Sequence, residues 1–359
     1  MKQGPSTSVA VDAEALRNFD AVIDTRSPAE FAEDHVPGAI SCPVLDNEER
    51  ARVGTLYKQV SPFDAKKLGA ALVAKNIAFH LQGSFRGKPR TWRPLIYCWR
   101  GGKRSAAMGH ILREIGWDAK TLEGGYKAYR RYVVESLAAL PARFTFRVIH
   151  GVTGSGKSRL LGALRGAGTQ VLDLEDLAAH RGSVLGNLPG RPQPSQKMFE
   201  SLLLQSLLSF DAAREILIEG ESRKIGQLQI PEALIERMRA SECVQLETGL
   251  ETRVALLLDE YRHFFTDLAA LDAQLDCLVG LHGRERIGEW KALAAAGQWQ
   301  PLVARLLEEH YDPAYRRSAP NNFPRLAQAR VFALAGAEQS AFERVARDIA
   351  QGSEQAVAA

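Results

Sequence analysis

The order of hydrophobic and polar positions predicts alternating strands and helices in the first half of the chain. Short runs rich in apolar residues at 20–26, 95–97 and 144–150 are typical of buried strands. Apolar positions at helical spacing follow the second and third of these runs, at 106–113 and 159–164. Strands and helices that alternate in this way indicate an α/β fold.

The same pattern continues beyond the middle of the chain before it changes. Residues 170–175 and 215–219 predict two further strands of a parallel sheet, with a long helix between them at 198–210. From residue 251 onward the apolar positions recur at helical spacing alone. A domain boundary near residues 141–144 therefore separates two α/β parts, and the second part is followed by a helical region.

Length and composition agree with this division. The chain has 359 residues, of which 45% are hydrophobic and 25% charged. At roughly 100–200 residues for each domain, this is enough for two or three domains. We place an α/β domain at residues 10–140, a second α/β domain with a parallel sheet at 144–249, and the helical region at 250–350.

The cysteines and the N-terminal sequence indicate a cytoplasmic protein. The four cysteines are Cys42, Cys98, Cys243 and Cys277. They stand far apart and form no CxxC pair, so we expect neither a disulfide framework nor a structural zinc site. The N-terminus lacks the features of a signal peptide, and no run reaches the roughly 18 apolar residues of a membrane span. We therefore expect a reducing compartment and no membrane partner.

One cysteine lies in a loop crowded with glycines and cations. Cys98 opens the run CWRGGKRS at 98–105, between a predicted strand and a predicted helix. Backbone N–H groups, the positive end of the helix dipole and the side chains of Arg100 and Arg104 favour a thiolate there. The same surroundings suit a charged persulfide or perselenide. The alternative is a buried, inert cysteine.

A phosphate-binding loop follows the strand predicted at 144–150. Residues 151–158 read GVTGSGKS, which is a complete Walker A motif. The glycines let backbone N–H groups turn toward phosphate oxygens, Lys157 supplies a mobile cation, and the Ser158 hydroxyl reaches magnesium if that ion binds. The predicted diphosphate-binding residues are Gly151, Gly154, Ser155, Gly156, Lys157 and Ser158. The motif predicts binding of a di- or triphosphate but not its hydrolysis.

Acidic residues near the predicted strand ends are candidates for the carboxylate that accompanies such a loop. Glu219 and Glu221 lie where a Walker B carboxylate is expected. The strand ends in Glu rather than the usual Asp, which argues against ATP hydrolysis. Asp173 is a second candidate. The alternative is that these acids only form ion pairs with Arg223 and Lys224.

Positive charge is concentrated before the phosphate loop. The net charge is +4, but residues 1–150 hold 23 Lys and Arg against 15 Asp and Glu, a surplus of 8. Cations are interleaved with Phe85 and Trp92 just before the Cys98 loop, which suits a phosphate backbone and an unstacked base. The cations predicted to bind nucleic acid are Arg86, Lys88, Arg90 and Arg93. The alternative is a solvated surface loop.

These motifs together resemble known families. The first part of the chain resembles a rhodanese domain. The segments that resemble a rhodanese domain are DTRSPAEF at 24–31, HVPGAI at 35–40, the Cys98 loop and GGY at 124–126. With the phosphate loop, the chain from about residue 20 to about residue 345 resembles the bacterial tRNA 2-selenouridine synthase family. This second resemblance also rests on LDNEER at 45–50, VGTLYK at 53–58, HRGS at 180–183 and EGESRKIG at 219–226.

The resemblance implies an enzyme, its substrates and the role of each motif. Members of the family replace the sulfur of wobble-position 2-thiouridine in tRNA by selenium from selenophosphate. They also use a prenyl diphosphate, usually geranyl diphosphate, which makes the sulfur a good leaving group as S-geranyl-2-thiouridine. The resemblance implies that Cys98 carries or positions selenium, while the phosphate loop neutralises the departing pyrophosphate. No tightly bound cofactor is expected.

The residues alone leave two other functions open. A kinase or ATPase joined to a sulfurtransferase would require nucleotide hydrolysis and a metal-bound Asp, and assays with nucleotides and prenyl diphosphates distinguish it. A binding protein with an idle rhodanese-like domain would tend to lack the cysteine, whereas Cys98 is present.

Overall fold

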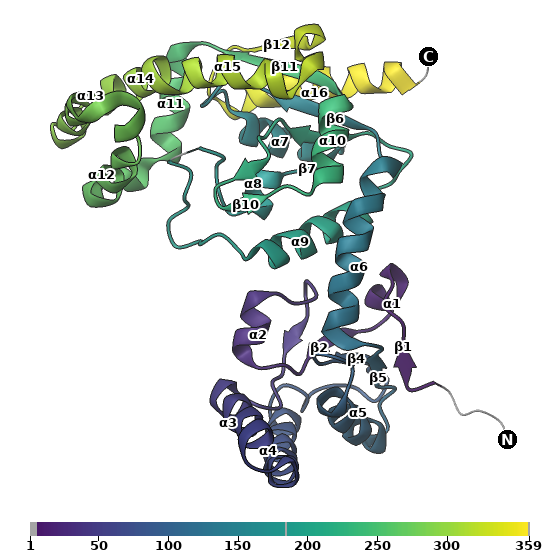
Figure 1. Ribbon diagram of the computed structural model, residues 1–359. Helices are drawn as coiled ribbons and strands as arrows, with labels where there is room; N and C mark the ends of the chain where they lie inside the picture. Colours follow the sequence, from purple (N-terminus) through teal and green to yellow (C-terminus); the bar gives the residue numbers. More distant parts are fainter. Residues whose placement is uncertain (1–5, 184, 358–359) are drawn as a thin grey trace. The chain divides into compact units, whose positions relative to one another are not determined.

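The computed structural model describes residues 6–183 and 185–357, which divide into two compact units (Figure 1). The first unit extends to Ser136 and takes in Glu200–Leu208. The second unit contains Leu137–Phe199 and the chain from Ser209 onward. Each unit has its own parallel sheet.

The first unit is built on five parallel strands in the order β1-β5-β4-β2-β3. Their bounds are Ser8–Val9 for β1, Ala21–Asp24 for β2, Ile40–Ser41 for β3, Pro94–Tyr97 for β4 and Lys120–Leu122 for β5. The central strand β4 is buried along its whole length, as expected for a parallel sheet covered on both faces. The strands predicted at 20–26 and 95–97 are confirmed.

Helices connect these strands and supply the remainder of the core. They are α1 (Ala13–Arg17), α2 (Pro28–Glu33), α3 (Asn47–Gln59), α4 (Pro62–Gln82), α5 (Lys103–Ile115) and α6 (Gly125–Ala139). Ser27 and Glu30 form a capping box at the start of α2, and Pro28 occupies the first turn. Side chains of α4 and α5, including Ile77 and Met108, pack with Ile96 of β4.

The second unit contains five parallel strands in the order β12-β11-β6-β8-β7. Their bounds are Phe146–His150 for β6, Gln170–Leu172 for β7, Ile216–Glu219 for β8, Glu242–Thr248 for β11 and Arg330–Leu334 for β12. Helix α7 (Lys157–Gly166) follows β6 and packs with the C-terminal helix α16 (Gln339–Val357). The strand and helix predicted on either side of the phosphate loop are confirmed.

Two expectations about this unit are wrong. The strand predicted at 170–175 ends at Leu172, because Asp173 caps a short helix, α8 (Leu174–Leu177), by accepting from the Asp176 N–H. The C-terminal part also contains β12, which pairs with β11 at the edge of the sheet. Its five residues lie among long helices, so the periodicity of the surrounding sequence concealed it.

The remaining elements are mostly helical, as predicted for the C-terminal region. The helices are α9 (Gln196–Ser209), α10 (Glu232–Ala240), α11 (Leu250–Glu260), α12 (Leu268–Asp276), α13 (Val279–Ala295), α14 (Trp299–Leu306) and α15 (Asp312–Asn322). Shorter elements are β9 (Lys224–Ile225), β10 (Leu228–Gln229), η1 (Leu140–Arg143), η2 (Arg262–Phe265), η3 (Leu307–Tyr311) and η4 (Pro324–Gln328). A separate apolar core around the fully buried Trp290 holds α12, α13 and α14 together.

Candidate active site

Cys98 lies at the carboxyl end of β4, where the loop to α5 wraps around its sulfur. The Gly102 N–H and the Ser105 hydroxyl each donate a hydrogen bond to Cys98 Sγ at 3.2 Å. Gly101 has φ +62°, and a Cβ there would lie 2.7 Å from the Leu122 carbonyl oxygen, so the turn requires glycine. Gly102 is also the N-cap of α5. Such donors stabilise a sulfur-centred or selenium-centred anion.

A second cysteine of this unit provides a contrast. Cys42 is fully buried in the apolar core beside Ile23 and Ile96. Burial, together with the negative charge of Asp24, raises the pKa of its thiol to about 12. A thiol in such surroundings stays protonated and unreactive. Burial alone therefore does not produce the arrangement found around Cys98.

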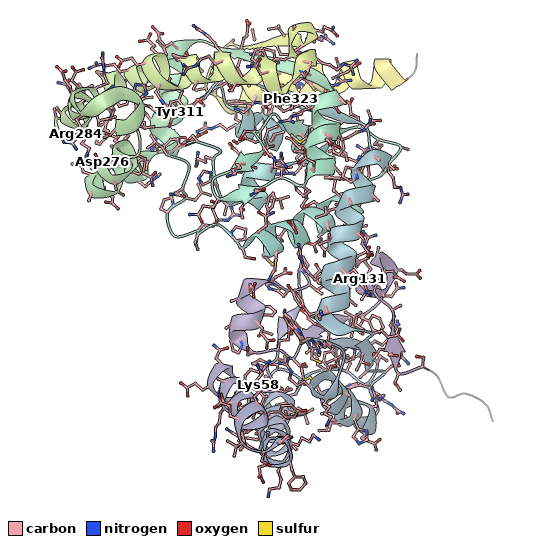
Figure 2. The ribbon with its side chains drawn as sticks, in the orientation of Figure 1. Lys58, Arg131, Asp276, Arg284, Tyr311 and Phe323 are labelled. Atoms are coloured by element: carbon pink, nitrogen blue, oxygen red, sulfur yellow. The ribbon has the colours of Figure 1, made fainter. Side chains whose placement is uncertain are left out.

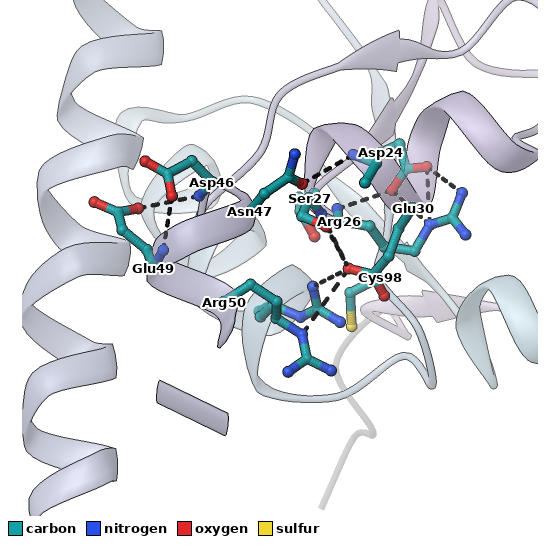
Figure 3. A network of polar contacts seen from close by, with 12 residues as sticks. Asp24, Arg26, Ser27, Glu30, Asp46, Asn47, Glu49, Arg50 and Cys98 are labelled. Atoms are coloured by element: carbon teal, nitrogen blue, oxygen red, sulfur yellow. Dashed lines mark hydrogen bonds and ion pairs between the residues drawn. The ribbon is translucent and has the colours of Figure 1, made fainter. Parts of the chain in front are cut away.

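An ion-pair network borders the Cys98 loop (Figure 3). Arg104 donates to Glu30 Oε2 at 3.1 Å, and Arg50 Nε lies 4.0 Å from the same oxygen. Burial opposes ionisation of Glu30, but the hydrogen bond and charge of Arg104 outweigh it and lower the pKa of Glu30. Of the predicted catalytic arginines, Arg104 is thus held by Glu30, whereas Arg100 is exposed. Sequence reasoning assigned no role to Glu30 or Arg50, which lie far from Cys98 in the sequence.

The cations predicted to bind nucleic acid precede β4, whereas Cys98 follows it. Arg93 and Cys98 are therefore separated by the strand, roughly 16 Å at 3.3 Å per residue. Nearness in the sequence therefore does not by itself place Arg93 beside the sulfur. Arg86, Arg90 and Arg93 are exposed, and the ammonium of Lys88 lies 5.4 Å from the centre of the Trp92 ring.

The aromatic residues of that cluster do not have the predicted role. Phe85 is 1% exposed and Trp92 is 3% exposed, and both pack in the core with Leu112 and its neighbours. Hydrophobic burial accounts for these rings, so they offer no surface on which a base stacks. The role of the four cations in binding nucleic acid stays a prediction.

The phosphate loop lies between β6 and α7 and opens into a cavity of about 310 Å³. All the predicted diphosphate-binding residues line this cavity. Gly154 and Gly156 have φ of +75° and +90°, which glycine adopts readily. Lys157 Nζ donates to the Gly151 carbonyl oxygen at 3.0 Å. Phe323 lines the cavity just after the end of α15 (Figure 2).

Buried carboxylates gather beside the phosphate loop. Ser158 Oγ donates to Glu175 Oε2 at 3.1 Å, and the Glu175 N–H donates to Glu219 Oε1 at 2.7 Å. Burial, together with the charge of Glu175, raises the pKa of Glu221 to about 8. Burial and the charge of Asp173 raise the pKa of Glu219 well above its usual range. Glu221 is therefore protonated at neutral pH and hydrogen-bonds to Glu175.

The structure changes the relative importance of the acidic candidates. Glu221 lines the cavity, whereas Asp173 caps α8 and lies 3.7 Å from Arg165. Glu175, which contacts Ser158, was missed because it was assigned to the end of a strand and in fact lies in α8. The alternative was that these acids only form ion pairs with Arg223 and Lys224. Arg223 instead pairs with Glu232.

A narrow apolar pocket adjoins the phosphate cavity. Its volume is about 50 Å³. It shares five lining residues with the cavity, namely Thr153, Ser183, Leu257, Tyr261 and Tyr311. Farther from the phosphate loop its walls include Phe264, Phe265, Leu271, Trp299, Leu302 and Leu306. The rings of Phe265 and Trp299 stack with centroids 4.5 Å apart. No motif predicted this pocket, because its walls come from segments that are distant in the sequence.

Within residues 6–183 and 185–357, no group of three or more His, Cys, Asp or Glu side chains is arranged to hold a metal ion. No helix in the part of the chain that the structure describes combines the length and apolarity needed to span a bilayer.

Comparison with known proteins identifies both units. The family model of the rhodanese-like domain matches residues 10–132, and that of the tRNA 2-selenouridine synthase AAA domain matches residues 144–275. The tRNA 2-selenouridine synthase of Nitrosomonas europaea is 37% identical over 67% of this chain and 63% of its own length, so the match spans less than two thirds of that relative. The enzyme of the same name from Alcanivorax borkumensis is 33% identical over 83% of this chain and 89% of its own length. The chain therefore belongs to the tRNA 2-selenouridine synthase family.

Proposed function

We propose that this protein converts 2-thiouridine at the wobble position of tRNA to 2-selenouridine. Selenophosphate would supply selenium, and S-geranyl-2-thiouridine, formed from geranyl diphosphate, would be the intermediate. The names of the relatives support tRNA as the substrate, and tRNA would be met in the cytoplasm. The observation that carries the proposal is the apolar pocket beside the phosphate cavity.

That pocket supports a prenyl diphosphate rather than a nucleotide as the ligand. In a nucleotide the phosphates are joined to a polar ribose, whereas in a prenyl diphosphate they are joined directly to a hydrocarbon chain. The pocket next to the loop has mainly apolar walls, which suit the hydrocarbon. At about 50 Å³ it is narrow for a ten-carbon chain, so the stacked rings of Phe265 and Trp299 would move outward on binding.

The first chemical step would be alkylation of the base. A lone pair of the thiocarbonyl sulfur forms a bond to C1 of the geranyl group, and the C1–O bond breaks. Pyrophosphate leaves with the electron pair of that bond, and the base loses its N3 proton, so the product is neutral. The loop N–H groups and Lys157 would stabilise the negative charge that grows on the pyrophosphate.

The second step would exchange sulfur for selenium. The selenium of selenophosphate forms a bond to C2 of the base, and geranylthiolate leaves with the electron pair of the C–S bond. Water then cleaves the P–Se bond, which releases phosphate and leaves 2-selenouridine with a proton on N3. Cys98 would position the selenophosphate for this attack, with the donors from Gly102 and Ser105 holding the negative charge on its sulfur.

The residues beside the loop fit a magnesium ion. The Ser158 hydroxyl and the carboxylates of Glu175 and Glu221 provide oxygen atoms, which are the ligands that magnesium prefers. Burial and, after it, the charge of Glu175 raise the pKa of Glu221, and a cation would offset the repulsion between the two carboxylates. When bound, the ion would help neutralise the pyrophosphate.

The test separates alkyl transfer from ATP hydrolysis. We expect Lys157→Ala to reduce geranylation on the order of 10²–10³-fold, because an electrostatic contact to the leaving group is lost. Selenation of 2-thiouridine tRNA should fall with it, whereas tRNA supplied already S-geranylated should be converted at the normal rate. Lys291→Ala, in α13 and outside the cavity lining, is the matched control.

The opposite pattern would refute the proposal. If ATP hydrolysis were the role of the loop, S-geranylated tRNA would not rescue the Lys157→Ala variant. The unmodified enzyme would then also depend on ATP, in an assay where alkyl transfer requires none.

A further inference from the structure

A histidine beside the phosphate loop has no role in the steps described above. His150 is the last residue of β6, is 1% exposed and lines the phosphate cavity. Among the residues that the structure describes, neither of its ring nitrogens has a hydrogen-bond partner. A buried polar group left in this state is costly, typically about 1–3 kcal/mol, so it requires an explanation.

The surrounding backbone is shaped to keep the ring in place. A Cβ on Gly220 would lie 2.3 Å from His150 Cε1 and 2.4 Å from Nδ1, so the imidazole fills the space that a side chain there would need. The Phe323 ring packs edge-on against it, with ring centroids 4.4 Å apart. The ring is therefore clamped between two elements while its polar atoms stay unpaired.

The buried position of His150 beside Lys157 also determines its charge. Burial, followed by the positive charge of Lys157, lowers the pKa of His150 to about 3. The imidazole is neutral at physiological pH, so it has one N–H donor and one acceptor nitrogen. Lys157 is close enough to influence it, which places His150 near the predicted diphosphate.

We propose that His150 is a ligand-binding and catalytic residue whose ring N–H donates a hydrogen bond to an oxygen of the diphosphate. This inference rests on the proposed function, because the ligand is the diphosphate of that reaction. No proton is transferred. As the C1–O bond breaks, its electron pair moves to the pyrophosphate, and the hydrogen bond strengthens with the growing charge on oxygen. The ligand thus supplies the partner that the buried ring lacks.

Binding of inorganic pyrophosphate to the full chain tests this directly. Isothermal titration calorimetry should show roughly tenfold weaker binding for His150→Phe, which keeps a ring but loses the donor. His150→Asn, which restores an N–H donor, should recover most of the affinity. The kcat for geranylation should fall more than the affinity in His150→Phe, by about 10²-fold, because the contact is stronger in the transition state.

A second variant keeps the imidazole and moves it. Gly220→Ala places a methyl group where the ring lies, so it should weaken pyrophosphate binding in the same direction as His150→Phe. Circular dichroism and thermal unfolding of each variant show whether it is folded. Equal pyrophosphate affinity in the parent, His150→Phe and Gly220→Ala would refute the role of His150. A parent protein that binds no pyrophosphate would instead refute the proposed function.

Discussion

The Cys98 loop and the phosphate loop use the same backbone design for different purposes. Each follows a parallel strand, contains glycine with positive φ and leads directly into a helix N-terminus. In the first loop, Gly102 donates its N–H to the Cys98 sulfur of the same loop. In the second, Lys157 contacts the loop's own carbonyl oxygen, and a cavity of about 310 Å³ lies alongside.

This difference indicates how each loop handles negative charge. The Cys98 loop provides both the hydrogen-bond donors and the sulfur atom that accepts from them, so its site is small and closely wrapped. The phosphate loop provides donors and a cation, but its anion must come from a ligand. The comparison therefore predicts that the two loops are separable, each required for one step and dispensable for the other.

Loss of the Cys98 thiol is expected to have the largest effect on activity. Cys98→Ala should reduce selenation on the order of 10³-fold or more, while geranylation and pyrophosphate binding stay near normal. Mass-spectrometric analysis of tRNA nucleosides measures both products. Cys277→Ala, which changes an exposed cysteine, is the control. Selenation that persists at the normal rate in Cys98→Ala would remove this thiol from the mechanism.

Replacing the four cations of the first unit that are predicted to bind tRNA should have a smaller effect. Losing four phosphate contacts should lower the steepness with which log K for tRNA falls with log[salt], the salt slope, by about 3–4. The affinity for tRNA at low salt should fall by about 10²-fold. The variant replaces Arg86, Lys88, Arg90 and Arg93 by Ala. The matched control removes the same charge from exposed lysines of α3 and α4, namely Lys58, Lys66, Lys67 and Lys75. Identical salt slopes in the variant and parent would show that tRNA lies elsewhere.

The apolar pocket is expected to set the preferred length of the hydrocarbon chain. Trp299→Ala should lengthen the pocket and shift the preference from geranyl toward farnesyl diphosphate by about tenfold, because further buried CH₂ groups each contribute roughly 0.8 kcal/mol. The ratio of kcat/KM for the two substrates measures the shift. Leu281→Ala, at an exposed position of α13, should leave the ratio unchanged. An unchanged ratio in Trp299→Ala would place the hydrocarbon outside this pocket.

The smallest expected effect concerns the carboxylates beside the phosphate loop. Burial raises the pKa of Glu221 to about 8, so the folded state binds this proton more tightly than the unfolded state. The resulting stability is fully present below about pH 4.5 and is lost as the pH rises toward 8. Relative to Glu221→Gln, the free energy of unfolding should fall by about 1 kcal/mol between pH 6 and 7. Denaturant titrations of both proteins at each pH, in the presence of EDTA, measure this change. Free energies of unfolding that change equally with pH in the parent and in Glu221→Gln would contradict the raised pKa of Glu221.

The local chemistry of both loops was predictable because each is a contiguous motif. Residues 98–105 and 151–158 specify their own turns, since glycine spacing and the adjacent strand and helix are properties of a short segment. The same holds for the strands at 95–97 and 146–150, whose apolar runs are long enough to recognise. Short segments of the sequence are therefore enough to predict both loops and the α/β fold.

Which further residues join each site depends on the tertiary structure. Glu175, His150 and Trp299 carry no motif, and their roles depend on burial and on neighbours that folding brings together. Phe85 and Trp92 are the opposite case. Their sequence neighbours predicted that they stack on a base at the surface, but both rings are buried in the core. The physical reason is that local backbone geometry depends on nearby residues, whereas desolvation and cavity shape depend on chain segments that meet only in the folded state.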